Sequence, residues 1–136
     1  MSVYFWKRGT TSAKYVMKAR ELKLLIMRAV ANSNKKQYGV YGAGKLVDHV
    51  CEFYRHCVKA NFIPQNENEI RIRYQFLILA RQEFVNVVSQ FADTSELMNF
   101  SDDILDQCST IMYEEDKLLK GIVESDRKRY AKYLHK

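Results

Sequence analysis

The strongest constraint on the fold of this sequence is a set of four segments in which apolar residues recur at spacings of three and four. This spacing places the apolar side chains on one face of an α-helix, and that face must be buried against another element. Four such segments, joined by short polar connections, predict an all-α, antiparallel up-down-up-down four-helix bundle. The expected helices run from 10–12 to about 32–34, from 44 to 61, from 67 to 91 and from 101 to 125.

Each expected helix has its own apolar stripe, and only the fourth stripe contains a charged residue, Glu115. In order, the stripes are Tyr15, Ala19, Leu22, Ile26, Ala29 and Val30; Leu46 or Val47, Val50, Phe53 or Tyr54, Cys57 and Val58; Ile70, Tyr74, Leu77, Phe84, Val88 and Phe91; and Ile104, Cys108, Ile111, Glu115, Leu118 or Leu119, and Ile122.

The breaks between helices come from residues with known effects on helix ends. Pro64 cannot continue a helix, so the second helix is expected to end before it. The polar run 93–95 (Asp-Thr-Ser) is expected to end the third helix, and Ser101 is a good N-terminal cap for the fourth.

Composition supports helices over sheets and excludes some classes of protein. One proline and five glycines, three of them within 39–44, are too few and too clustered for the turns of a β-sandwich. No apolar run approaches the roughly 18 residues of a membrane span. Three cysteines without paired spacing indicate reduced thiols, two of them at core positions, in a cytoplasmic protein.

The net charge of +6 is unevenly distributed along the chain. Residues 1–41 contain nine Lys and Arg and one acid, and residues 127–136 contain five Lys and Arg and no acid. Residues 93–126 contain ten acids and two lysines. Both ends therefore favour binding to phosphates or acidic proteins, whereas the acidic fourth helix is expected to face away from nucleic acid.

The basic residues give a set of candidate nucleic-acid contacts on a bundle spanning 1–126, with a short N-terminal arm, and on a basic tail spanning 127–136. The candidates are Lys7 and Arg8 in the arm, Lys14 and Lys18 in the first helix, Lys35, Lys36 and Lys45 around the first loop, Arg127, Lys128 and Arg129 in the tail, and Arg71 and Arg73 as secondary positions.

Two patterns resemble reactive sites, but neither has all the required parts. Residues 39–45 (GVYGAGK) have the glycine and lysine spacing of a phosphate-binding loop, but Leu46 replaces the required Ser or Thr and no strand precedes the motif. His49, Glu52 and His56 share one helical face, but that face is polar and no second helix offers matching ligands. We therefore predict no catalytic residues, no metal site, no cofactor and no enzymatic activity.

Four stretches, in order, are similar to a known family of four-helix bundles. They are KAREL at 18–22, VCEFYRHCVKAN at 50–61, RIRYQFLILA at 71–80, and ILD at 104–106 followed by EDKLLKGIVES at 115–125. The family contains the accessory variability determinant of diversity-generating retroelements and the proteins encoded in ribosomal-RNA intervening sequences.

This resemblance implies a non-enzymatic accessory protein that forms a homopentamer and binds a reverse transcriptase and its template RNA or cDNA through basic surfaces. The residues alone leave a second reading open, in which the bundle is a protein-interaction module, an adaptor or inhibitor, with no nucleic-acid role.

Overall fold

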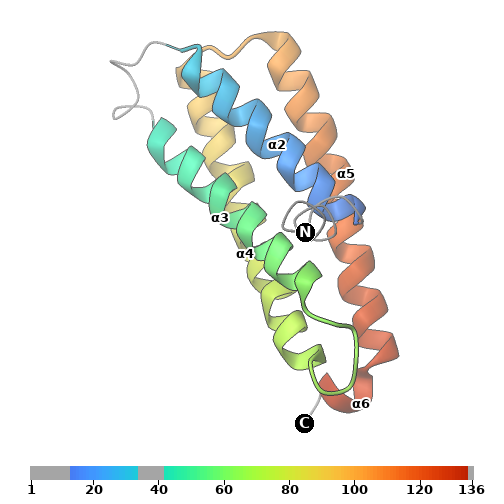
Figure 1. Ribbon diagram of the computed structural model, residues 1–136. Coiled ribbons are helices and arrows are strands. Elements are labelled where there is room, and N and C mark those ends of the chain that lie inside the picture. The colour runs from blue at the N-terminus through green and yellow to red at the C-terminus, as the bar shows by residue number, and fades with distance from the viewer. Residues whose placement is uncertain (1–12, 34–41, 135–136) are drawn as a thin grey trace, which may run out of the picture.

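The computed structural model describes residues 13–33 and 42–134 and forms an all-α four-helix bundle (Figure 1). The helices pack in a closed ring, α2 against α3, α3 against α4, α4 against α5 and α5 against α2. None of the described helices is long and apolar enough to cross a membrane. The helices are α2 (Lys14–Ala31), α3 (Ala43–Phe62), α4 (Ile70–Leu97), α5 (Asp102–Arg129) and the single turn α6 (Ala131–Leu134).

The predicted stripes form most of the bundle core. All six stripe residues of α2 are buried, as are Leu46, Val50, Phe53 and Cys57 of α3. One position on α4 was wrong: Val87 is buried and Val88 is exposed. Val87 lies three residues after Phe84 and four before Phe91, which are both buried, so its side chain points to the core.

The third helix does not end at 93–95 as predicted, because two of these residues are buried within α4. Thr94 and Ser95 have partners inside the helix: the Gln90 amide donates to the Thr94 hydroxyl at 2.9 Å, and the Ser95 hydroxyl donates to the Ala92 carbonyl at 3.3 Å. Local hydrogen bonds of this kind let the helix pass through a polar run. The chain leaves the helix at Asn99, which has a φ of 54°.

The predicted N-terminal end of the fourth helix is confirmed, and its predicted C-terminal end is wrong. The Ser101 hydroxyl accepts a hydrogen bond from the Ile104 amide at 3.3 Å and caps the helix, as expected. The C-terminal end lies later than predicted, since α5 continues to Arg129 and α6 follows it. Tyr130 is buried between them, and its hydroxyl donates to the Gln65 carbonyl at 2.6 Å, which holds the chain end against the α3–α4 loop.

Glu115 interrupts the apolar stripe of α5 and is fully buried in the core. Neither of its carboxylate oxygens has a hydrogen-bond partner in the described part of the chain. Burial raises the pKa of Glu115 from 4.5 to about 9, and the positive charge of Lys18 opposes this effect only weakly. At neutral pH the side chain is therefore protonated, which removes the cost of burying a charge.

The buried Glu115 makes stability depend on pH. The unfolded chain ionises this group above about 4.5 and the folded chain only near 9, so the unfolded state is favoured progressively as pH rises between these values. We expect Glu115→Gln to be more stable than the wild type at pH 8 by more than about 1.4 kcal/mol, the equivalent of one pH unit. The difference should shrink towards pH 5. Urea unfolding at several pH values measures it, and parallel stability curves for the two proteins would contradict it.

Gly42 precedes α3 and has a backbone conformation that other residues avoid. Its φ is +73°, and a Cβ at this position would collide with the Gln90 amide. Gly44, two residues later, lies inside the helix with open space where a Cβ would be. Of the three glycines within 39–45, the two that the structure describes therefore have different roles: Gly42 is required by the turn, and Gly44 is not.

The two glycines are a matched pair for mutation. Gly42→Ala is expected to destabilise the protein by about 1 kcal/mol or more, because it adds left-handed strain and a collision. Gly44→Ala is expected to stabilise it by about 0.5–1 kcal/mol through helix propensity. Thermal unfolding followed by circular dichroism measures both. Equal effects of the two substitutions would show that the turn conformation at Gly42 is not required.

Candidate nucleic-acid interface

Tertiary structure brings four of the predicted cations together at one end of the bundle. The Arg71 Nε donates to the Tyr133 carbonyl at 2.8 Å, and the Arg127 Nη2 donates to the Tyr74 hydroxyl at 3.3 Å. The start of α4 therefore lies against α6 and the end of α5, as Figure 1 shows near the C-terminus. We call this group of exposed cations the basic end. Its members are Arg71, Arg127, Lys128, Arg129 and Lys132.

The basic end keeps an excess of positive charge over its neighbours. Its five cations lie near three acids, Glu67, Glu69 and Glu124, which leaves a local charge of about +2. The contact between Arg127 and Glu124 is 3.7 Å long and solvent-exposed, so it neutralises little. The hydrogen bond to Tyr74 raises the pKa of Arg127 above its usual value, so this guanidinium stays charged.

A polar groove of about 560 Å³ opens beside these cations. It is lined by three side-chain amides and the Glu67 carboxylate of the α3–α4 loop, by Arg129, and by the rings of Tyr130 and Tyr133. Asn66 holds the loop in place, because its side-chain oxygen accepts from the amides of Asn68 and Glu69 at 3.0 and 2.9 Å. The groove therefore combines a guanidinium, a carboxylate, amide groups and aromatic rings on a loop whose backbone is held by hydrogen bonds to Asn66.

Arg73 was predicted as a surface cation, and the structure corrects this. The residue is 5% exposed, and its Nε donates to the Asp126 carboxylate at 2.8 Å. Its Nη1 donates to the Ala60 carbonyl at 3.0 Å. The Gln65 amide also donates to Asp126, at 2.9 Å. Arg73 is thus a structural residue beneath the basic end and does not reach a ligand on the surface.

The other predicted cations do not join this surface. Lys18 is paired with Glu114 at 2.7 Å and with Glu21 at 3.4 Å, and Lys14 lies beside it along the α2–α5 groove. Lys45 is exposed in the first turn of α3, at the far end of the bundle from α6 (Figure 1). Four further candidates, Lys7, Arg8, Lys35 and Lys36, lie outside the described residues.

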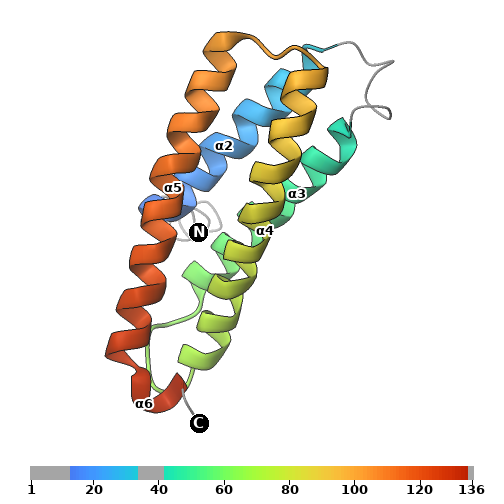
Figure 2. The ribbon, with the colours of Figure 1, turned by 180° about the vertical axis from the view of Figure 1, so that it is seen from behind.

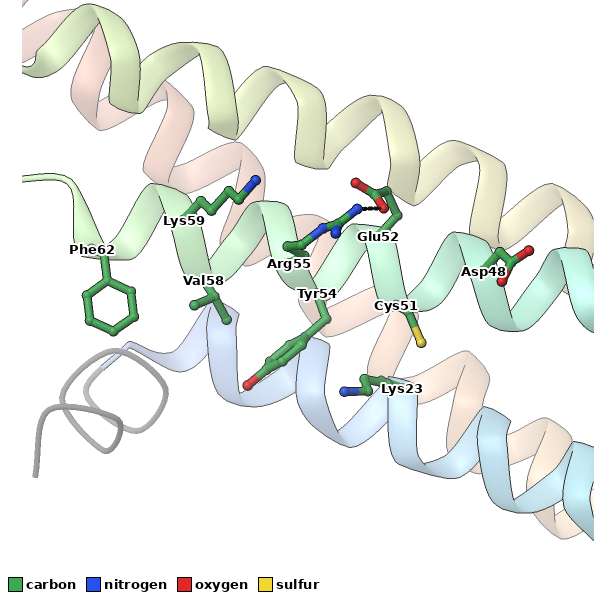
Figure 3. A pocket seen from close by; sticks show the side chains of 9 residues that line it. All are labelled: Lys23, Asp48, Cys51, Glu52, Tyr54, Arg55, Val58, Lys59 and Phe62. Carbon is green, nitrogen blue, oxygen red and sulfur yellow. Dashed lines mark hydrogen bonds and ion pairs between the residues drawn. The ribbon is translucent and has the colours of Figure 1, made fainter. Parts of the chain in front are cut away.

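A second groove, of about 660 Å³, runs between α2 and α3 and was missed by sequence analysis (Figure 3). The Lys23 ammonium lies over the Tyr54 ring, 4.6 Å from its centroid, and Arg55 is paired with Glu52. The exposed ring of Phe62 lies at one end of the groove. Cations, acids and apolar groups are mixed here, so the groove has no single charge preference.

The polar face of α3 is less exposed than predicted. The side chain of His49 is paired with Glu83 of α4, and the ring of His56 lies 6.3 Å from that of Phe76. These histidines therefore pack against α4, with side chains that are 34% exposed at His49 and 14% exposed at His56. In the described parts of the chain, no three His, Cys, Asp or Glu side chains are grouped to hold a metal ion.

The cysteines are unpaired, and the two on apolar stripes, Cys57 and Cys108, are buried as predicted. Burial raises the pKa of both thiols, which opposes their conversion to reactive thiolates. Comparison of the chain with protein families, curated proteins and solved structures finds no match.

Proposed function

We propose that this chain is a non-enzymatic protein that binds single-stranded RNA or cDNA through its basic end, as an accessory to the reverse transcriptase of a diversity-generating retroelement. The observation that carries the nucleic-acid part is the gathering of Arg71 with the cations of 127–132 beside a polar groove. The reverse transcriptase is proposed from the sequence resemblance described above.

The chemistry of the basic end suits a phosphate backbone. Guanidinium groups match the geometry of phosphate oxygens, and exposed lysines add charge without fixed orientation. Tyr133 borders the groove, with the Lys132 ammonium 6.0 Å from its ring centroid, and a ring with a cation beside it is of the kind that stacks an unpaired base next to a phosphate. The acidic α5 surface lies along the side of the bundle, so a nucleic acid is expected to approach from the end.

Self-association, as a homopentamer, and a cytoplasmic location belong to the same proposal. The outer face of α2 supports a contact between copies, since Met17 and Met27 are exposed apolar residues on it. Exposed apolar residues on one face are typical of protein contact surfaces. Measurement of the molar mass in solution tests this part separately.

The alternative function is a protein-interaction bundle with no nucleic-acid role. The α2–α3 groove favours it, because Tyr54, Val58 and Phe62 line the groove together with charges of both signs. A protein ligand matches such a mixed surface better than a polyanion does. An acidic protein is the expected ligand in this reading, since the chain has a net positive charge.

The affinity for single-stranded RNA should depend on the lysines of the basic end. We expect Lys128→Ala/Lys132→Ala to weaken the binding of a fluorescent 20-nucleotide RNA. The plot of log affinity against log salt concentration should become less steep by about 1.4, or about 0.7 for each lost phosphate contact. The matched control is Lys117→Ala/Lys120→Ala, which removes two exposed lysines from the acidic part of α5. Fluorescence anisotropy at several salt concentrations measures both variants.

The outcomes of this experiment separate the two functions. A wild-type affinity that does not change with salt, or an equal loss in both double variants, rejects the basic end as the binding surface. Absence of RNA and duplex DNA binding at low salt favours the protein-interaction module.

A further inference from the structure

The polar groove at the basic end contains a carboxylate, which is unfavourable for a site that binds only phosphate. Glu67 lines the groove together with Arg129 and the ring of Tyr133. A carboxylate repels phosphate oxygens, whereas it accepts hydrogen bonds from the N–H groups of a nucleobase. The presence of Glu67 is therefore explained if the groove receives a base while the cations around it bind the phosphates.

The ring of Tyr133 is held at both ends of the residue. The hydrogen bond from its hydroxyl to the Glu67 carboxylate raises the pKa of Tyr133 above its usual value. Its backbone carbonyl accepts from the Arg71 Nε at 2.8 Å. The Lys132 ammonium lies 6.0 Å from the centroid of the ring. A ring that is already fixed in this way loses little conformational entropy when a base stacks on it.

The opposite side of the groove is positioned by Tyr130 and the α3–α4 loop. The Tyr130 hydroxyl donates to the Gln65 carbonyl at 2.6 Å, so the loop lies against the junction of α5 and α6. Figure 2 shows this loop beside α6 at the same end of the bundle. The Arg129 guanidinium lies 5.5 Å from the Tyr130 ring centroid and forms no ion pair with another described residue. Its N–H donors can therefore bind a ligand in the groove.

A carboxylate acceptor and a guanidinium donor in one groove match the edges of guanine better than those of the other bases. Guanine has the N7 and O6 acceptors that arginine binds most often in specific contacts. Its N1–H and N2–H₂ groups are adjacent donors, which the two oxygens of one carboxylate can accept together. Adenine and cytosine each have a single amino group, and uracil has a single N–H. A carboxylate has about four acceptor sites, so the bond from Tyr133 leaves Glu67 able to accept from a base.

We propose that the groove binds an unpaired guanine base that stacks on Tyr133, with Glu67 accepting from the guanine N1 and N2 and Arg129 donating to O6 or N7. The inference deepens the proposed function and rests on it, because it assigns a base preference to the same site. The basic end then binds any single strand through its phosphates, and it binds strands that contain guanine more tightly.

The preference can be measured with oligouridines of ten nucleotides that contain one central guanosine, one central adenosine or no purine. The adenosine oligomer controls for stacking, because adenine is also a purine. We expect the full chain to bind the guanosine oligomer about tenfold more tightly than the adenosine oligomer, as one good bidentate contact allows. Inosine, which lacks the N2 amino group, should bind at least about threefold more weakly than guanosine. Fluorescence anisotropy at low salt measures all four oligomers.

A matched pair of variants tests the role of the carboxylate. Glu67→Gln should abolish the preference for guanosine over adenosine, because the amide has only one acceptor oxygen and places N–H donors near those of guanine. Binding of the all-uridine oligomer should be retained or become tighter, since a negative charge is lost. The control is Glu124→Gln, which removes the same charge near the basic end from a side chain that is 54% exposed and lies outside the groove. This control should keep the preference of the wild type, and circular dichroism should show unchanged helix content in both variants.

The possible outcomes separate this inference from the proposed function. Equal affinity of the wild type for the guanosine and adenosine oligomers overturns the guanine site. The site is also overturned if Glu67→Gln keeps the preference, or if Glu124→Gln loses it to the same extent. Salt-dependent binding that is equal for all oligomers rejects only the guanine site and leaves binding by the basic end standing. Absence of binding to every oligomer rejects the proposed function and the guanine site together.

Discussion

The buried ion pair between Arg73 and Asp126 joins four parts of the chain at the basic end. Arg73 also binds the carbonyl of Ala60 at the end of α3, and Asp126 also accepts from Gln65 in the α3–α4 loop. The start of α4 and the end of α5 are therefore held together by the pair itself. Removing one partner of such a pair leaves an unpaired charge in the core. The folded state therefore requires Arg73, Asp126 and their hydrogen-bond partners to be in position at the same time. This contact, together with the Arg71–Tyr133 and Tyr130–Gln65 hydrogen bonds, holds the segments that carry the basic end near one another.

The basic end and the acidic part of α5 lie at different places along the bundle, while α2 and α3 carry charges of both signs. Five cations gather where α5 and α6 meet the start of α4, whereas most acids of α5 lie further towards its N-terminal end. Since charges more than a Debye length apart are largely screened, about 10 Å at 0.1 M salt, the acids near the start of α5 weaken the positive potential of the basic end only slightly.

Much of the fold follows from local patterns, but the candidate site does not. The stripe from Tyr15 to Val30 and the cap at Ser101 were predictable because they depend on helical spacing and on a hydroxyl beside its own helix. The run 93–95 misled the prediction, because Thr94 and Ser95 found hydrogen-bond partners inside α4. Arg73 was misplaced because its partner, Asp126, lies 53 residues away, and no local pattern shows which arginine meets an acid in the core.

The sequence by itself determined the helices, their apolar faces and the separation of basic and acidic segments, because these properties depend on residues within a few turns of one another. Tertiary structure decided which charges meet. It placed Arg71 beside α6, buried Arg73, and left Val85 and Val88 outside the core. The reason is that the packing of the helices sets how each helix is rotated and which helices are its neighbours. The sequence of one polar helix face does not specify which other face it will contact.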